Sequence, residues 1–201
     1  MNEPSARAPR LLLIPGSQRT ESFNARLLGD FALRLEGLCA IDLLGPGEVD
    51  LPLFNQDLET APELVARVTA LHRRIACSHG LIVASPDYNG QLTPYLKNLV
   101  DWVSRLAYIV AGCGNAFVDR PTLLCSASTG GSGGALAIPN ARALFGYVGC
   151  VVIGDTVCIP HAGQAWTGDG YAFGPDVDEQ ITAALQRVLR LASSFAVTCD
   201  F

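Results

Sequence analysis

A nine-residue segment near the N-terminus carries side chains that suit an anionic ligand. Residues 16–24 read GSQRTESFN and combine three hydroxyl groups with one arginine and two amides. An apolar run ends just before them and a helical pattern begins within them, so they join a predicted strand to a predicted helix N-terminus. Free backbone N–H groups and the helix dipole favour a phosphate group at such a point. A serine that merely caps the helix is the plainer alternative.

Two further segments follow predicted strands and let the backbone approach a ligand. Residues 86–90 read PDYNG, in which Asn-Gly favours a turn with exposed N–H groups and the tyrosine offers a flat apolar face. An ordinary Asn-Gly turn is the alternative here. Residues 126–134 read SASTGGSGG, and their glycines leave the backbone uncovered. Together with residues 16–24, these segments are the candidate ligand-binding loops.

The glycine-rich segment also matches the pattern GxSxG around Ser132, which raises the alternative of a serine hydrolase. Asp155 and His161 follow in the chain order of such a triad. The nucleophile of these enzymes lies on a sharp turn directly after a strand, whereas residues 126–131 separate Cys125 from Ser132. The match is therefore weak evidence for hydrolysis.

Composition limits the class of protein. The chain has 201 residues and a net charge of −5, with 49% apolar and 16% charged residues. The charged share is below the roughly 25% of typical domains. Such an apolar chain is not disordered, and the acidic balance argues against a nucleic-acid partner. We expect one domain over residues 1–201, with residues 1–9 disordered.

The apolar excess does not indicate a membrane protein. The longest uncharged run, residues 121–141, is interrupted by glycines and prolines, so it does not read as a spanning helix. The N-terminal residues lack the apolar core of a secretory signal, which predicts a cytoplasmic protein. The seven cysteines contain no CxxC, and the three histidines have no metal-ligand spacing. We therefore expect reduced thiols and no metal site.

Strand-like and helix-like patterns alternate along the chain. We expect strands at residues 10–15, 39–44, 80–85, 121–126 and 150–153. We expect one helix capped by Ser22, three that begin near Pro62, Pro94 and Ala135, the second of these capped by Thr93, and a last helix capped by Asp176 or Asp178. A Gly-rich loop is expected at residues 162–175.

This alternation predicts an open α/β sheet with helices on both faces. The favoured arrangement is a flavodoxin-like three-layer α/β/α sandwich, whose five-stranded parallel sheet has the order 2-1-3-4-5. The strand order reverses between strands 1 and 3, and ligands of such sheets bind beyond the carboxyl ends of the strands at that point. The loops after strands 1, 3 and 4 should therefore carry the chemistry.

The same loops resemble those of the NADPH-dependent FMN reductase family. The family patterns are GSxRxxSxN, LPLYNxD, PEYNG and LKNxxDWxSR, together with a further, glycine-rich motif. The matching segments are GSQRTESFN at 16–24, LPLFNQD at 51–57, PDYNG at 86–90, LKNLVDWVSR at 96–105 and the glycine segment at 128–134. The resemblance extends from Leu11 to about Leu191, which is nearly the whole chain.

The resemblance implies a role for each loop. The FMN phosphate is expected to be bound by Ser17, Arg19, Ser22 and Asn24. The isoalloxazine ring is expected to be bordered by Pro86, Asp87, Tyr88, Asn89 and Gly90, and its other edge or the ribityl chain by Ser128, Thr129, Gly130 and Gly131. No side chain is expected to be catalytic, because the cofactor carries the redox chemistry.

The implied reaction is a ping-pong hydride relay from NADPH or NADH, through bound FMN, to a small acceptor. Quinones, azo compounds, metal ions and free flavin all suit such a site. An electron carrier without NADPH turnover is the alternative, although the phosphate loops of such carriers lack an arginine like Arg19. The chain departs from the family at Asp87, where glutamate is usual, and at Leu136, where arginine is frequent.

Residues 99–118 carry apolar side chains on several faces of a predicted helix and its exit. Asp101 and Arg105 are the only charged residues among them. Because one apolar face is enough to cover a sheet, we expect a second buried surface. The resemblance implies that this surface, within residues 94–118, joins copies of the chain into a homodimer or a homotetramer.

Overall fold

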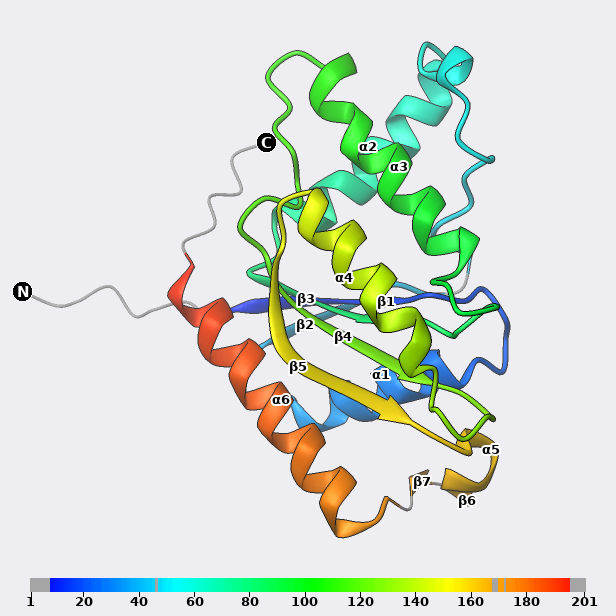
Figure 1. Ribbon diagram of the computed structural model, residues 1–201. Helices are drawn as coiled ribbons and strands as arrows, with labels where there is room; N and C mark the ends of the chain where they lie inside the picture. Colours follow the sequence, from blue (N-terminus) through cyan, green and yellow to red (C-terminus); the bar gives the residue numbers. More distant parts are fainter. Residues whose placement is uncertain (1–7, 46, 168–169, 172, 196–201) are drawn as a thin grey trace, which may run out of the picture.

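The computed structural model describes residues 8–45, 47–167, 170–171 and 173–195. Its main sheet has five parallel strands in the order β2-β1-β3-β4-β5, as the sequence predicted (Figure 1). The strands are β1 (Arg10–Pro15), β2 (Ala40–Leu43), β3 (Gly80–Ala84), β4 (Pro121–Ala127) and β5 (Val151–Ile159). The helices are α1 (Phe23–Arg34), α2 (Pro62–Ala76), α3 (Pro94–Ile109), α4 (Ile138–Tyr147), α5 (Ala162–Ala165) and α6 (Pro175–Ser194), with short 3-10 turns at Gln56–Leu58 and Ala135–Ala137.

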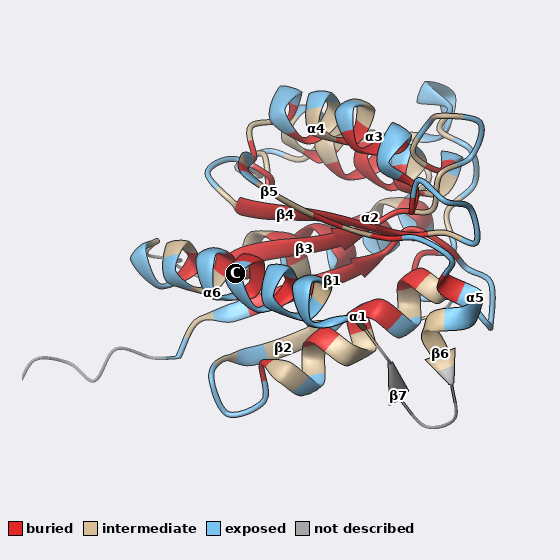
Figure 2. Cartoon of the chain, turned by 60° about the horizontal axis from the view of Figure 1, so that its bottom comes forward, coloured by how far each residue is buried: buried red, intermediate tan, exposed pale blue. Residues whose placement is uncertain are grey.

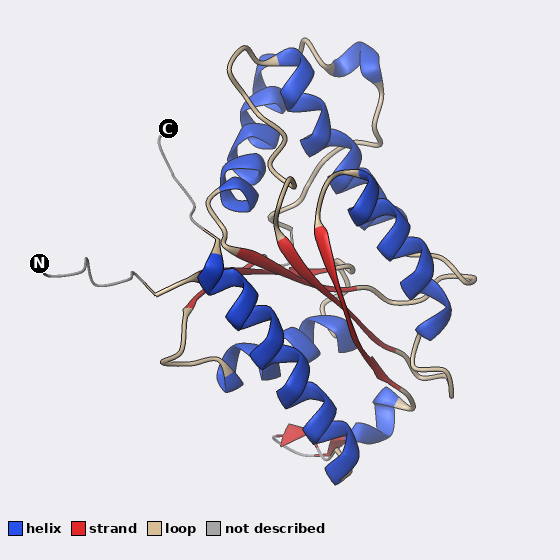
Figure 3. Cartoon of the chain, turned by 60° about the vertical axis from the view of Figure 1, so that its left-hand side comes forward, coloured by secondary structure: helices blue, strands red, loops and turns tan. Residues whose placement is uncertain are grey.

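Helices cover both faces of the sheet and form three layers (Figure 3). Helices α1 and α6 pack on one face, while α2, α3 and α4 lie over the other. The buried sheet runs between these layers in Figure 2. Every residue of β3 and β4 is buried, which explains why these strands read as continuous apolar runs. The predicted fold is thus confirmed.

Helix α3 is buried on more than one face within a single chain, and this changes the expectation for residues 99–118. Its residues Leu99, Trp102 and Leu106 belong to the core that α2, α3 and α4 share with the sheet. Trp102 is 1% exposed, stacks edge-on against Phe54, and donates from Nε1 to the Pro52 carbonyl at 2.7 Å. The polypeptide after β2 therefore covers the side of α3 that the sheet does not cover. Most of the apolar excess needs no second subunit.

The predicted helix caps hold at two starts and fail at a third. The hydroxyl groups of Ser22 and Thr93 accept backbone N–H bonds at the starts of α1 and α3. Helix α6 begins at Pro175 after Gly174, so Asp176 and Asp178, one of which we expected as its cap, both lie in the first turn. Proline at the first helical position sets the backbone angle there and needs no hydrogen-bonded N–H.

Two segments carry more regular structure than the sequence predicted. Strand β5 continues past residue 153 to Ile159, because an irregularity opposite Thr122–Leu124 absorbs extra residues and the pairing with β4 then resumes. The expected loop at 162–175 contains helix α5 and a two-stranded hairpin of β6 (Trp166–Thr167) and β7 (Gly170–Tyr171). Of this loop, residues 168, 169 and 172 lie outside the described residues, as do residues 1–7 of the expected disordered segment.

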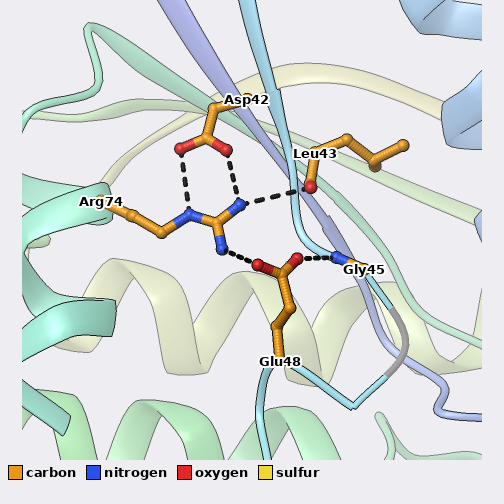
Figure 4. A network of polar contacts seen from close by, with 5 residues as sticks. All are labelled: Asp42, Leu43, Gly45, Glu48 and Arg74. Carbon is orange, nitrogen blue, oxygen red and sulfur yellow. Dashed lines mark hydrogen bonds and ion pairs between the residues drawn. The ribbon is translucent and has the colours of Figure 1, made fainter. Parts of the chain in front are cut away.

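An ion-pair network fixes the chain that leaves β2 (Figure 4). Arg74 of α2 donates to both carboxylate oxygens of Asp42 in β2 and to Glu48 beyond it. Glu48 in turn accepts from the backbone N–H of Gly45. Bidentate arginine–carboxylate pairs are directional, so this network sets where the loop after β2 begins its path over α3.

Among the residues that the structure describes, one cysteine differs from the expectation of reduced thiols. Cys39, Cys113, Cys125, Cys150 and Cys158 are free, and burial raises the pKa of Cys39 and of Cys150 to about 11. Cys77 is disulfide-bonded, so reduced thiols are not found throughout. In the described part of the chain, no group of three His, Cys, Asp or Glu side chains could hold a metal ion. No helix found there is long and apolar enough to cross a membrane.

Candidate functional site

The loops after β1, β3 and β4 meet around one cavity of about 190 Å³ at the carboxyl end of the sheet. Eight of the thirteen predicted site residues line it: Ser17, Arg19, Asn24, Pro86, Asp87, Tyr88, Ser128 and Thr129. Ser22, Asn89, Gly90, Gly130 and Gly131 do not line it. The cavity lies where the reversal of strand order places ligands in such sheets.

Glycine at position 16 lets the backbone of the first loop pass close to Leu96 and Ser85 as it leaves the sheet. A Cβ at Gly16 would lie 2.7 Å from Cδ1 of Leu96 and 2.9 Å from Cα of Ser85. The Gly16 N–H donates to the Ala84 carbonyl at 2.7 Å, and its carbonyl accepts from the Thr93 hydroxyl at the same distance. Because Thr93 also caps α3, one side chain joins the first loop to the helix that follows the second.

The first loop presents unpaired donors at the start of α1. Among the residues that the structure describes, no acceptor is found for the N–H groups of Ser17, Gln18 and Thr20. The Ser17 hydroxyl accepts from the Arg19 N–H at 3.2 Å. The exposed Arg19 side chain donates from Nη2 to the Glu21 carbonyl at 2.8 Å, which leaves other guanidinium donors for a ligand. This cluster of donors suits an anion.

Two of the predicted phosphate ligands have structural partners of their own. Asn24 is 2% exposed; its Nδ2 donates to the Ala127 carbonyl and its Oδ1 accepts from the Ala127 N–H, both at 2.9 Å. The Ser22 hydroxyl accepts from the Ala25 N–H as the cap of α1. Asn24 therefore ties α1 to the end of β4, although its side chain also borders the cavity.

The second loop is a tight two-residue turn. Tyr88 and Gln91 exchange backbone hydrogen bonds of 3.0 and 3.2 Å, and the residues between them, Asn89 and Gly90, have φ of 57° and 78°. These residue types tolerate that left-handed backbone. Tyr88 remains half exposed at the cavity, and Asp87 accepts the Gly90 N–H on Oδ1 at 2.7 Å. The loop thus presents a flat ring and a carboxylate in fixed positions.

The third loop packs two of its glycines, Gly133 and Gly134, against the sheet. A side chain at Gly134, where φ is +82°, would overlap the hydroxyl of the fully buried Ser126. The Ser128 hydroxyl accepts from the Gly130 N–H at 3.2 Å, and the Ser128 carbonyl accepts from the Ala162 N–H at 2.9 Å. The start of this loop is therefore held between β4 and α5.

The triad of a serine hydrolase is not assembled. Asp155 forms an ion pair of 3.0 Å with Arg187 of α6. The Ser132 hydroxyl accepts the Gly134 N–H at 3.4 Å, within its own loop. His161 has a left-handed backbone at the start of α5, and its imidazole lies beside Gly131. The Asp155 carboxylate, which would have to orient the histidine, is thus paired with a helix on one face of the sheet. The hydrolase alternative therefore fails.

The structure adds residues that the sequence reasoning did not single out. Phe23 lines the cavity and stacks on Trp166, with ring centroids 5.3 Å apart, so the segment after α5 supports the cavity wall. Ala127 also lines the cavity, through its place at the end of β4. Asn140 of α4 donates to the Gly90 carbonyl at 3.0 Å. An aromatic residue within GSQRTESFN was a usable signal, whereas the other two depend on tertiary contacts.

Known proteins with this arrangement are redox enzymes. The family model described as NADPH-dependent FMN reductase matches residues 9–164. A 2-hydroxy-1,4-benzoquinone reductase from Burkholderia sp is 30% identical over 146 residues, which cover 73% of this chain and 75% of that protein. A quinone reductase from Escherichia coli (strain K12) is 26% identical over 144 residues, which cover 72% and 73% of the two chains.

A solved structure agrees with these sequence matches. The flavoenzyme NAD(P)H:(acceptor) oxidoreductase FerB from Paracoccus denitrificans superposes with a TM-score of 0.77 at 26% identity, and the match covers 92% of this chain and 97% of that chain. The family model spans all three loops of the cavity. By its sequence match, its fold and its site, this chain belongs to the NADPH-dependent FMN reductase family and is an oxidoreductase that uses FMN and NAD(P)H.

Proposed function

We propose that this protein is a quinone reductase, which transfers a hydride from NAD(P)H through FMN to a small quinone. The observation that carries the proposal is the single cavity in which an arginine-bearing phosphate loop meets the Asp87–Tyr88 turn and the Ser128–Thr129 loop. Relatives named as quinone reductases support the choice of acceptor. The acceptor screen described below compares quinones with azo compounds, metal ions and free flavin.

The first loop fits the FMN phosphate. The phosphate would accept from the Ser17, Gln18 and Thr20 N–H groups, which have no acceptor among the described residues. Arg19 would add a charged donor, and the α1 dipole would favour the negative charge. We assign Ser22 and Asn24 to holding this loop in shape, because their polar atoms already bond to Ala25 and Ala127.

The other two loops fit the ring. Pro86 and Tyr88 offer apolar surface on one side of the cavity, and Ser128 and Thr129 offer hydroxyl groups and backbone on the other. When bound, FMN supplies hydride transfer between NAD(P)H and the acceptor. The chain binds and orients the two reactants, and the fixed Tyr88–Gln91 turn keeps the ring side of the cavity rigid.

Absorbance spectroscopy tests the cofactor and its reduction. Purified protein, reconstituted with FMN and freed of excess, should show the flavin bands. NADPH or NADH added under nitrogen should bleach them, and a benzoquinone should restore them. A protein that stays colourless with added FMN contradicts the proposal. A flavin that no nicotinamide reduces indicates the electron carrier instead.

A steady-state screen then names the acceptor. Quinones should give a higher kcat/KM than azo dyes, chromate, iron chelates or free FMN with the same nicotinamide. Double-reciprocal plots should give parallel lines, as expected for the ping-pong order. In that order, the concentration of one substrate changes the apparent kcat and the apparent KM for the other by the same factor. A better azo, metal-ion or flavin substrate would replace quinone in the proposal.

We further propose that the chain forms a homodimer or a homotetramer through residues 94–118. Tyr108 and Val118 support this, because they stay 78% and 44% exposed beside a buried helix face. Light scattering at micromolar concentration should give a multiple of 21.3 kDa, and Tyr108→Glu should lower it. A monomer of the wild-type chain contradicts the proposal. The cytoplasmic location remains a prediction, which cell fractionation tests.

A further inference from the structure

The two peptide groups that flank Gly90 are each held by a side chain, one from the same loop and one from α4. Its N–H donates to Asp87 Oδ1 at 2.7 Å, and its carbonyl accepts from Asn140 Nδ2 at 3.0 Å. Gly90 has φ of 78°, in the middle of the turn that presents Tyr88 to the cavity. A turn with one fixed peptide on either side of its glycine has little freedom to reorient. We call the contacts of Asp87, Gly90 and Asn140 the amide clamp.

Asn140 connects this turn to helix α4, which is packed against the sheet. It is the third residue of α4, which follows the glycine loop after the 3-10 turn at Ala135–Ala137. The same helix buries Ala141 and Phe145 against the sheet, and its Arg142 donates to the Ile153 carbonyl of β5 at 2.8 Å. The donor of the clamp is therefore fixed to the sheet independently of the turn that it holds.

The clamp also joins two of the loops around the cavity. A Cβ at Gly134, the last residue of the glycine loop, would lie 3.5 Å from the Cβ of Asp87. The loop after β3 and the loop after β4 are thus in contact at Asp87, and Asn140 adds a hydrogen bond just beyond this contact.

We propose that Asn140 is a positioning residue for the flavin ring. By fixing the Gly90 carbonyl, it orients the loop that carries Pro86, Asp87 and Tyr88, the three residues of that loop that line the cavity. Its effect on the ring rests on the proposed function, in which the ring lies beside residues 86–90. Asn140 itself does not line the cavity, so it acts through the turn.

Three variants test the proposal. Asn140→Ala removes the donor, and Asn140→Asp replaces it with a carboxylate oxygen that faces the Gly90 carbonyl. Asn115→Ala is the matched control. The Nδ2 of Asn115 donates to the Val148 carbonyl at 2.9 Å and its Oδ1 accepts from the Phe117 N–H at 3.0 Å. This residue precedes β4 and therefore lies toward the amino end of the strands, away from the cavity. Comparison with this control separates a local effect on the turn from general loss of stability.

The first readout is amide hydrogen exchange without cofactor. Exchange of the Tyr88, Gly90 and Gln91 N–H groups should be faster in both Asn140 variants and unchanged in Asn115→Ala. The second readout is flavin binding and potential. Asn140→Ala should bind FMN about 2- to 10-fold more weakly, the range of one neutral hydrogen bond, with a shifted midpoint potential. Asn140→Asp should show a larger effect.

The outcomes separate this inference from the proposed function. If the wild-type chain binds FMN while the Asn140 variants match Asn115→Ala in exchange, affinity and potential, the positioning role is overturned and the proposed function stands. If the wild-type chain does not bind FMN, both are overturned. Faster exchange at the turn together with weaker FMN binding supports the role that we assign to Asn140.

Discussion

At the scale of single residues, the partner of a side chain decides what it does. The pattern that placed Arg19 and Asn24 in one phosphate loop does not distinguish them. In the folded chain, the Arg19 guanidinium is exposed with donors to spare, whereas both polar atoms of Asn24 bond to Ala127. One residue of the motif is therefore available to a ligand, while the other holds two strand-end loops together.

Arg19→Ala should weaken FMN binding without unfolding the protein. A hydrogen bond to a charged group contributes roughly 1.5–3 kcal/mol, so the Kd for FMN should rise about 10- to 150-fold. Arg26→Ala is the control, since Arg26 lies on the exposed side of α1 beside Trp166 and does not line the cavity. Fluorescence titration with FMN measures both. Equal affinities of the two variants would remove Arg19 from the phosphate site.

Gly134→Ala should destabilise the fold, and Gly146→Ala should not. Gly134 has φ of +82°, and an added Cβ would meet the Ser126 hydroxyl, so roughly 1–3 kcal/mol of backbone strain adds to the overlap. Gly146 lies inside α4 with open space around its Cβ position, where alanine contributes about 0.5–1 kcal/mol of stability. Urea denaturation compares them. Equal midpoints would contradict the geometry of the glycine loop.

At the scale of elements, α3 connects the site to the loop after β2. Asn98 donates to the Leu51 and Pro52 carbonyls and accepts from the Phe54 N–H at 2.7 Å. The hydrogen bond from Trp102 reaches the same loop. Because Thr93 caps this helix and bonds to Gly16, the helix that carries the loop also positions the start of the phosphate loop.

Asn98→Ala should therefore lower the free energy of unfolding far more than Asn55→Ala, which changes an amide within the loop itself. It removes three hydrogen bonds and should lower the free energy of unfolding by roughly 2–4 kcal/mol. Asn55→Ala removes one exposed bond to the Asp57 N–H and should cost about 1 kcal/mol or less. Chemical denaturation monitored by tryptophan fluorescence measures both. Similar losses would mean that the loop is not held through α3.

At the scale of the whole molecule, the apolar composition is explained within one chain. Both faces of the sheet are covered by helices, and α3 is covered a second time by α2 and by the loop after β2. A three-layer sandwich with doubly buried strands needs apolar residues on nearly every strand position. The composition therefore gives little independent support to self-association, which depends on exposed positions such as Tyr108.

Acid should destabilise the molecule partly through His79, at the amino end of β3. Burial, and then Arg120 and Arg10, lower the pKa of His79, and its Nδ1 accepts from the Arg10 N–H at 3.1 Å. The unfolded chain binds the proton more readily, so stability falls as pH decreases through the unfolded pKa of about 6.5. Melting temperatures at pH 7.5 and 5.5 should differ less for His79→Asn, whose side-chain oxygen can accept the same bond. Identical differences would contradict this role.

Local patterns determined the order of strands and helices, the fold class and most of the cavity residues. Buried parallel strands appear in the sequence as apolar runs, and ligand loops follow their carboxyl ends. Both features can therefore be recognised from the sequence alone. The long β5 was missed because Gly154 and Asp155 resemble a turn, while pairing with β4 carries the strand past them. Residues 162–165 formed α5 for a similar reason, since contacts of Ala162 with Ser128 hold its start.

Only the tertiary structure decided which polar side chains remain available to a ligand. The Asn24 bond to Ala127, the Asn140 bond to Gly90 and the Thr93 bond to Gly16 join segments far apart in the chain. The same holds for the covered face of α3, which packs against Phe54 and α2 in the fold. A sequence states what each side chain can bond to; the packing of distant segments selects the partner that it has.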